Sequence, residues 1–258
     1  MILDDIIKVK EQEVSALKKK FEGKDPKKLI EGLPHTRNFL SAFGPGKFSL
    51  IAEIKKASPS AGIIRPLFDP ISLAKTYEES GAAAISVLTD KEFFQGKLEY
   101  IKAAKESTII PILRKDFIID ELQVYESRIA GADAVLLIKK VLDDEKLVSL
   151  LKLTEELGMQ ALVEVHNSKE AERVLMTDAK IVGINNRDLK IFRVDKKNTI
   201  SLIKKLPELK ERIIISESGI KNKADVQALK GAGANGILVG ETLLKSNNIP
   251  AKINELLN

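Results

Sequence analysis

The sequence predicts an α/β protein in which strands and helices alternate and close into a (β/α)8 barrel, the TIM barrel fold, with an N-terminal helical extension. Three observations support this fold class. Eight short β-branched and aliphatic runs follow one another from residue 48 onward. Amphipathic segments with apolar residues at three- and four-residue spacing separate these runs. The repeat fills residues 48 to 240, or about 24 positions per strand and helix, which suits a compact barrel.

The predicted elements can be followed in chain order. Clear helical runs are DPISLAKTYEES, IIDELQVYESRIA and DDEKLVSLLKLTEEL. Gly81, Gly131, Gly158 and Gly233 each end a helical run just before a strand, where a left-handed residue stops the helix. A doubly wound open sheet is the alternative, but it usually has fewer strands, and no GxGxxG follows the first strand here. The strand segments are FSLIAEI, AAISVLT, PILRKD, ADAVLLI, QALVEV, KIVGINN, RIIISES and NGILVG.

The first part of the chain, residues 1–47, lies outside the repeat. It predicts a helix over LDDIIKVKEQEVSALKKK, short helical pieces around Pro26 and Pro34, and a loop at GPGK. We expect this extension to cover one mouth of the barrel. No linker or low-complexity segment separates it from the barrel at 48–258, so residues 1–258 are expected to form a single domain.

Composition and charge exclude several classes of function. The net charge of +5 arises from 42 basic and 37 acidic residues that are largely intermixed, which is typical of solvated helix surfaces. No basic run is interleaved with aromatic residues, so no nucleic-acid partner is expected. The absence of Cys excludes disulfides and a Cys nucleophile and fits a cytoplasmic protein. Asp4 and Asp5 interrupt any signal peptide, no apolar run could span a membrane, and a monomer is the simplest expectation.

The carboxyl ends of the predicted strands are unusually polar. Alternation along the first strand places Glu53 and Lys55 on one face and Leu50, Ala52 and Ile54 on the other. A single charge at a strand end is usually a surface ion pair. Several charges that converge on one mouth indicate a site, because they cannot be desolvated cheaply unless they are paired or serve a ligand. The polar residues at strand ends are Glu53, Lys55, Lys115, Glu164, Asn185, Arg187, Glu217 and Ser218.

Two glycine turns predict an anion site. Gly219 follows the seventh strand in SESGI, and Gly240 follows the eighth in LVGETLL. Backbone N–H groups at such turns can converge on a phosphate, and the loops after these two strands often bind one in barrels. Ordinary tight turns are the alternative interpretation. Glu241 is awkward beside a phosphate, so its side chain is expected to turn away.

The two histidines and the metal-binding types offer little. His35 lies in the extension and is interpreted as structural. His166 shares a face with Glu164 but lies two residues beyond the strand end, beside a helix start with Asn167 or Ser168 as cap, so a catalytic role is not favoured. No metal site is expected, because the carboxylates at the strand ends alternate with lysines that would repel a cation.

Eight motifs in order resemble one family across nearly the whole chain: AEIKKASPSAG, SVLTDKEFFQG, PILRKDFIID, GADAVLLI, LVEVH, GINNRDL, ISESGI and LVGETLL. This family is indole-3-glycerol phosphate synthase, a (β/α)8-barrel lyase of tryptophan biosynthesis. The resemblance implies that the chain cyclises 1-(2-carboxyphenylamino)-1-deoxyribulose 5-phosphate to indole-3-glycerol phosphate, as a carboxy-lyase that releases carbon dioxide and water. It also implies that no metal or organic cofactor takes part.

The resemblance assigns the site residues position by position. The catalytic lysines would be Lys55 and Lys115, and the catalytic carboxylates Glu53 and Glu164, with Glu164 as the base of the dehydration. Many relatives have a small residue where this chain has Glu241, which would offer only its backbone. The remaining assignments are Asn185, Arg187 and Ser218 for positioning, Glu217 facing the substrate, Ser58, Gly219, Gly240 and Glu241 at the phosphate, and Phe94, Phe117, Leu136 and Leu189 at the anthranilate ring.

The lysine that acts as acid at each step is open at this point. For Lys115 we expect a pKa below the reference of about 10.4, because the apolar Phe117 and the charge of Lys55 should outweigh Glu53 and Glu164. Three other functions remain. A phosphoribosylanthranilate isomerase would call for a Cys after the first strand, a Schiff-base aldolase would use Lys55 or Lys115 as nucleophile, and a barrel could bind a phosphosugar without turning it over.

Overall fold

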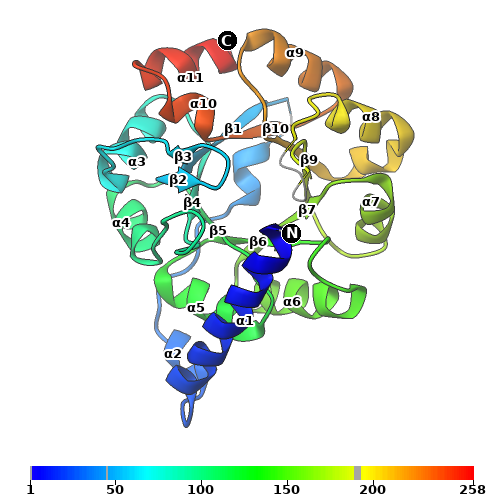
Figure 1. Cartoon of the computed structure of the whole chain (residues 1–258). Helices are drawn as coiled ribbons and strands as arrows, with labels where there is room; N and C mark the ends of the chain where they lie inside the picture. Colours follow the sequence, from blue (N-terminus) through cyan, green and yellow to red (C-terminus); the bar gives the residue numbers. More distant parts are fainter. Residues whose placement is uncertain (1, 45, 189–192) are drawn as a thin grey trace.

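The computed structural model describes residues 2–44, 46–188 and 193–258, and in it eight parallel strands form a closed barrel (Figure 1). Around the barrel the strands follow in the order β1, β10, β9, β8, β7, β6, β5 and β4, and β4 pairs with β1 to close the ring. The predicted barrel and its eight strand segments are therefore confirmed. The strands are β1 Ser49–Ile54, β4 Ala84–Leu88, β5 Ile112–Lys115, β6 Ala134–Ile138, β7 Gln160–Val165, β8 Ile181–Asn185, β9 Ile213–Glu217 and β10 Gly236–Val239.

Helices surround the barrel, and a small hairpin of β2 Ala57–Ser58 and β3 Gly62–Ile63 follows β1 (Figure 1). The four glycines expected to stop helices have positive φ angles of 94°, 94°, 77° and 106° in chain order, as predicted. Asn167 caps α7 by accepting a hydrogen bond from Glu170 N at 3.0 Å, as its sequence context indicated. The helices are α3 Pro70–Glu79, α4 Glu99–Ser107, α5 Glu121–Ala130, α6 Asp144–Glu156, α7 Ser168–Leu175, α8 Asn198–Lys205, α9 Lys223–Ala232, α10 Glu241–Leu244 and α11 Ile249–Leu257, with a 3₁₀ turn η2 Pro207–Glu211.

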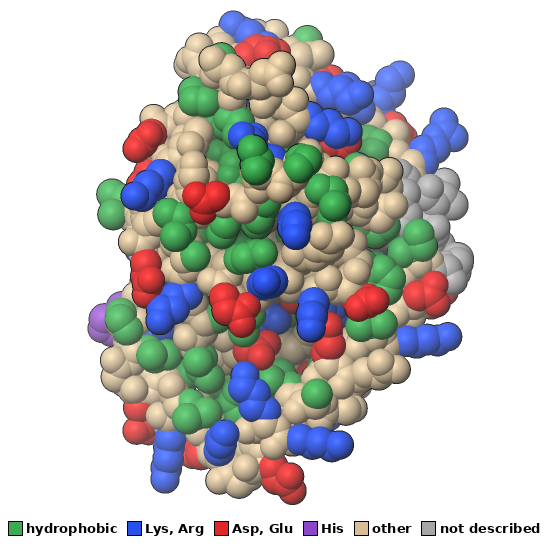
Figure 2. All heavy atoms as spheres, turned by 60° about the vertical axis from the view of Figure 1, so that its left-hand side comes forward, with side chains coloured by type: hydrophobic (Ala, Val, Ile, Leu, Met, Phe, Trp, Pro, Cys, Tyr) green, Lys and Arg blue, Asp and Glu red, His purple; other side chains and the backbone are tan. Residues whose placement is uncertain are grey.

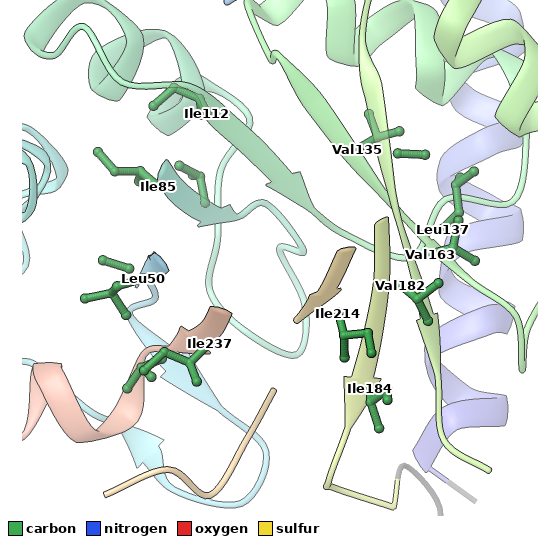
Figure 3. Close-up of a cluster of buried hydrophobic side chains, with 14 of the residues drawn as sticks. Leu50, Ile85, Ile112, Val135, Leu137, Val163, Val182, Ile184, Ile214 and Ile237 are labelled. Carbon is green, nitrogen blue, oxygen red and sulfur yellow. The ribbon is translucent and has the colours of Figure 1, made fainter. Parts of the chain in front are cut away.

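The barrel wall separates two apolar clusters. Leu50, Ala52 and Ile54 point outward and pack in the cluster between strands and helices, part of which Figure 3 shows. Ile51 and Leu113 belong to the cluster that fills the barrel interior. This alternation is the one expected from the sequence, and it turns Glu53 and Lys115 inward, each two residues along its strand from an interior aliphatic residue.

Charges are dispersed over the outside. On the face shown in Figure 2, Lys and Arg side chains are interspersed with Asp and Glu, and no large patch of a single sign covers the helices. This distribution agrees with the expectation that the positive excess lies mainly on solvated helix surfaces.

The extension reaches both ends of the barrel rather than the one mouth expected. At the amino ends of the strands, the 3₁₀ turn η1 Leu40–Phe43 packs under the interior, and Phe39 N donates to Gln160 Oε1 at 3.0 Å. Arg37 N donates to Asp133 Oδ1 at 2.6 Å in the same region. A helical piece around Pro34 was wrongly predicted, since the chain from 33 to 38 is non-helical and its polar groups bond to the starts of strands instead.

The helices α1 Ile2–Phe21 and α2 Pro26–Ile30 pack against α5 (Figure 1). The helix predicted near the N-terminus and the piece at Pro26 are thus confirmed. In the described ranges, α1 included, no helix combines the length and the apolar character that crossing a membrane requires.

One buried lysine fastens α1 to the carboxyl ends of β4 and β5. The side chain of Lys10 is 1% exposed, and its Nζ lies 2.8 Å from Asp90 Oδ2 and 2.9 Å from Asp116 Oδ1. Asp90 Oδ1 accepts a hydrogen bond from Phe94 N at 3.2 Å, and Asp116 Oδ1 accepts one from Phe117 N at 2.8 Å. Lys10 therefore joins the two loops that carry these aromatic rings.

We expect Lys10→Met to destabilise the fold by about 3–5 kcal/mol, because it leaves two buried carboxylates without their common counter-charge. Urea unfolding of the purified variant measures the change. Lys18→Met is the matched control on the same helix, since Lys18 is 61% exposed and its pair with Asp120 should contribute less than about 1 kcal/mol. Equal stability of the two variants would contradict the anchoring role of Lys10.

Candidate active site

A cavity of about 740 Å³ opens at the carboxyl ends of the barrel strands. Every predicted site residue that the structure describes lines it, whereas Leu189 lies outside the described residues. The predicted residues that it brings together are Glu53, Lys55, Ser58, Phe94, Lys115, Phe117, Leu136, Glu164, Asn185, Arg187, Glu217, Ser218, Gly219, Gly240 and Glu241.

Lys115, at the end of β5, bridges two glutamates from other strands. Its Nζ lies 3.4 Å from Glu164 Oε2 on β7 and 3.3 Å from Glu217 Oε2 on β9. Burial lowers the pKa of Lys115, but the charges of Glu217, Glu164 and Glu53 outweigh burial and raise the pKa above the usual lysine range. The lowered pKa expected from the sequence is therefore wrong, because the structure adds a third carboxylate to the two that were weighed.

Glu53 and Lys55 form the second pair, on β1 and just beyond it. Lys55 Nζ lies 2.5 Å from Glu53 Oε2, and Tyr77 Oη donates to the backbone carbonyl of Glu53 at 3.1 Å. A Cβ at Gly240 would overlap Glu53 Oε2. Gly240 is thus required for a reason that the sequence did not reveal: it leaves space for this carboxylate as well as bare backbone at the cavity wall.

Glu217 is the most isolated carboxylate of the site. It is 1% exposed, and within the described part of the chain neither carboxylate oxygen has a hydrogen bond of good geometry, so the Lys115 ion pair is its main polar contact. Burial raises the pKa of Glu217, Lys115 opposes this, and the nearby Glu164 and Glu53 raise it further. A carboxyl group in these surroundings is held protonated around neutral pH.

Gly183, inside β8, is a residue that sequence analysis missed. A Cβ there would overlap Glu217 Oε1, so only glycine leaves room for this carboxyl group. The signal was present in GINN, since a glycine within a strand often marks a close approach by another group.

The loops after β8 and β9 carry the polar positioning residues. Asn185 Oδ1 accepts a hydrogen bond from Arg187 N at 2.9 Å, and Arg187 Nη1 donates to Ser60 Oγ at 3.2 Å. Ser218 has a φ of 68°, and Asn186 Nδ2 donates to its carbonyl at 3.0 Å. Ser218 is therefore held in a left-handed conformation that is uncommon for a non-glycine residue, which fits a functional position.

The two ends of the cavity differ in character. At one end Phe94 and Phe117 face each other with ring centroids 6.3 Å apart, beside Leu136. The other end is polar, and Glu241 there accepts a hydrogen bond from Lys245 Nζ at 2.6 Å, so its carboxylate is engaged within its own helix. This arrangement suits a ligand with an aromatic head and an anionic tail. No cluster of three or more His, Asp or Glu side chains with metal-binding geometry occurs in the ranges described.

Comparisons with known proteins agree with this geometry. A family model described as indole-3-glycerol phosphate synthase matches residues 3–256. A protein of that name from Desulforamulus reducens is 48% identical over 258 residues, which cover 100% of this chain and 97% of the relative. One from Acetivibrio thermocellus is 46% identical, with 99% and 98% covered. A solved 3-hexulose-6-phosphate synthase superposes with a TM-score of 0.63 over 81% of this chain and 98% of its own at 19% identity, which supports the fold alone.

The closed barrel, with ammonium and carboxylate groups converging on a cavity at its carboxyl ends, defines a (β/α)8-barrel enzyme. The full-length similarities go further: the chain belongs to the indole-3-glycerol phosphate synthase family. The family, the reaction and the class of carboxy-lyase in tryptophan biosynthesis, all predicted from the motifs, are confirmed.

We expect Glu217→Gln to stabilise the protein while it lowers turnover at least about tenfold. The folded-state pKa of Glu217 is raised to about 8, so the stability of the wild type falls as the pH rises from about 4.5 to 8, whereas a neutral amide avoids this loss. The gain should be about 1–2 kcal/mol at pH 8 and near zero at pH 5. Urea unfolding at both pH values checks it, and a difference that does not change with pH would contradict the raised pKa.

Proposed function

We propose that this protein converts 1-(2-carboxyphenylamino)-1-deoxyribulose 5-phosphate to indole-3-glycerol phosphate, carbon dioxide and water, with the residues of the cavity in the roles given below. The observation that carries the proposal is the polarity of the cavity, which has aromatic side chains at one end, glycine turns at the other, and two lysines with three glutamates between them. The substrate has the same sequence of chemical groups from its anthranilate ring to its phosphate.

Phe94 and Phe117 would hold the anthranilate ring, with Leu136 and, by the family resemblance, Leu189. Their apolar surfaces suit the ring and also favour loss of carbon dioxide, because a poorly solvated carboxylate is easier to expel. At the opposite end, Ser58 and the backbone of Gly219, Gly240 and Glu241 would hold the phosphate. The α10 N-terminus at Gly240 has no capping side chain, which leaves its first N–H groups available.

Ring closure needs a proton donor at the ribulose carbonyl, since attack by the aromatic carbon creates an alkoxide there. We assign this role to Lys115, whose ammonium is kept charged by Glu164 and Glu217. An alkoxide is a much stronger base than a lysine amine, so the proton moves readily at that moment despite the raised pKa of Lys115. Lys55 would hold the substrate carboxylate, and Glu53 would orient Lys55 and bind substrate hydroxyls.

The dehydration needs a base and an acid. Glu164 suits the base, because its pKa is lowered: burial raises it, but Lys115, His166 and a hydrogen bond from Asn185 outweigh burial. Glu217 is protonated near neutral pH and adds a third proton donor for the departing hydroxide, beside Lys55 and Lys115. Two carboxyl groups with opposite pKa shifts in one cavity form the usual pattern of an acid–base pair.

The alternative functions find less support. A Schiff-base aldolase needs a lysine that is a free amine, whereas Lys115 is flanked by two carboxylates and Lys55 is paired with Glu53. The isomerase would require a Cys, and the chain contains none.

The direct test adds the carboxyphenylamino-deoxyribulose phosphate to the purified protein and follows indole fluorescence. We expect signal growth that requires the enzyme and disappears in Lys115→Met. No signal from the folded wild type would overturn the proposed function, and borohydride trapping of a ketose phosphate on Lys55 or Lys115 would favour the aldolase instead.

The pair Lys115→Arg and Lys115→Met separates proton donation from charge. A guanidinium keeps the positive charge but does not give up its proton, so we expect both variants to lose about 10²-fold or more in ring closure. Single-turnover rates at matched saturation measure this loss. Ring closure near the normal rate in Lys115→Arg would contradict the assignment and pass the acid role to Lys55.

A further inference from the structure

His166 lies behind the proposed base and does not line the cavity. It follows Glu164 by two residues at the end of β7, so both side chains lie on one face of the chain. The imidazole is 6% exposed, with Nε2 3.2 Å from Glu164 Oε1 and Nδ1 3.3 Å from Glu170 Oε2. The Nε2 contact is too bent for a hydrogen bond of good geometry, which makes it an ion pair held by charge.

Glu170 is rigidly placed on the far side of the imidazole. Its Oε2 accepts a hydrogen bond from His166 N at 2.7 Å, and its Oε1 accepts one from Asn167 Nδ2 at 2.6 Å. Asn167 is itself the cap of α7, and Asn198 Nδ2 donates to His166 O at 3.1 Å. The carboxylate therefore cannot easily turn away, and the ring is fixed between α7 and the catalytic strand end.

An imidazole between two carboxylates satisfies both of them only when both of its nitrogens carry a proton. Burial lowers the pKa of His166, but Glu164 and Glu170 outweigh burial and raise the pKa to about 9. The pKa of Glu170 is lowered, since its hydrogen bonds to His166 and Asn167 and the charge of His166 outweigh its burial. The cluster thus holds an imidazolium at neutral pH, between two ionised carboxylates.

We propose that His166 is a positioning residue for Glu164: held as an imidazolium by Glu170, it keeps Glu164 ionised and aims its second oxygen at Lys115 and the substrate. This inference deepens the proposed function and rests on the role of Glu164 as base. His166 itself does not touch the substrate.

A second cation is needed because of the reaction sequence. Lys115 is the other positive partner of Glu164, and it gives up a proton during ring closure. At that moment Glu53, Glu164 and Glu217 share the cavity with less positive charge, and repulsion would favour protonation of Glu164 before it acts as base. The charge of His166 does not change during the chemistry, so Glu164 remains a carboxylate until the dehydration.

The first experiment is an NMR titration of the imidazoles, which needs no substrate. The chain has two histidines, so His35→Gln assigns the His166 signal. We expect His166 to titrate near pH 9 in the wild type, and its pKa to fall by about one unit or more in Glu170→Gln. A His166 that titrates below about pH 7 would overturn the proposal whether or not the enzyme turns over the expected substrate.

The second experiment compares pH profiles of turnover. His166→Gln keeps a donor but removes the charge, so we expect kcat at neutral pH to fall about tenfold or more, with KM changed less than about twofold. Its acidic limb should move up by about one pH unit, because Glu164 then ionises without a neighbouring cation. Glu170→Gln should shift the limb in the same direction by less, and it serves as the second variant if His166→Gln folds poorly.

A merely structural histidine predicts different results. It would lower activity only in proportion to the folded fraction, leave the acidic limb in place, and add its loss to that of Glu164→Gln. If His166 acts through Glu164, the double variant His166→Gln with Glu164→Gln should be no slower than Glu164→Gln alone. An additive loss or an unmoved acidic limb would overturn the proposal, and His35→Gln should match the wild type in every measurement.

Discussion

The barrel mouth must bury charge, and most features of the site follow from how that charge is balanced. Closing eight strands brings Lys115 within 3.4 Å of Glu164 and within 3.3 Å of Glu217, with the Glu53–Lys55 pair on the neighbouring arc. Two ammonium groups cannot neutralise three carboxylates. The structure resolves the excess by keeping one carboxyl group protonated, at Glu217, and by placing an imidazolium behind another, at Glu164. The opposite pKa shifts that acid–base chemistry needs are therefore a consequence of one charge imbalance.

Space for these carboxyl groups is made by glycines. The Glu217 carboxyl group occupies the position that a side chain at Gly183 would take, and Glu53 occupies that of Gly240. Because the carboxyl groups press against backbone, they cannot swing out to water, and burial sets their protonation. Substituting Gly240 would displace Glu53 as well as altering the phosphate end, so such a variant could not test the phosphate site by itself.

The sequence predicted the features that depend on local pattern. Period-two alternation placed Glu53 and Lys115 inward, and glycines after helical runs stopped those helices in the left-handed conformation as expected. It failed where distant segments meet. The piece near Pro34 is not helical because its polar groups bond to strand starts, and the pKa shift of Lys115 depends on Glu217, which is distant in sequence. His166 was discounted for lying beyond its strand, although alternation still turned it toward Glu164.

The same extension that closes the stable end of the barrel also reaches the reactive end. Phe39 and Phe43 seal the interior at the amino ends of the strands, where burial is apolar and stabilises without chemical consequence. Lys10, from the same extension, is fixed at the carboxyl ends by Asp90 and Asp116, whose other oxygens hold the backbone of Phe94 and Phe117. The spacing of the aromatic pair thus depends on an ion pair outside the cavity. Since charged groups at the mouth tend to destabilise the fold, an anchor of this kind fixes the ring-binding walls without adding another charged side chain to the cavity itself.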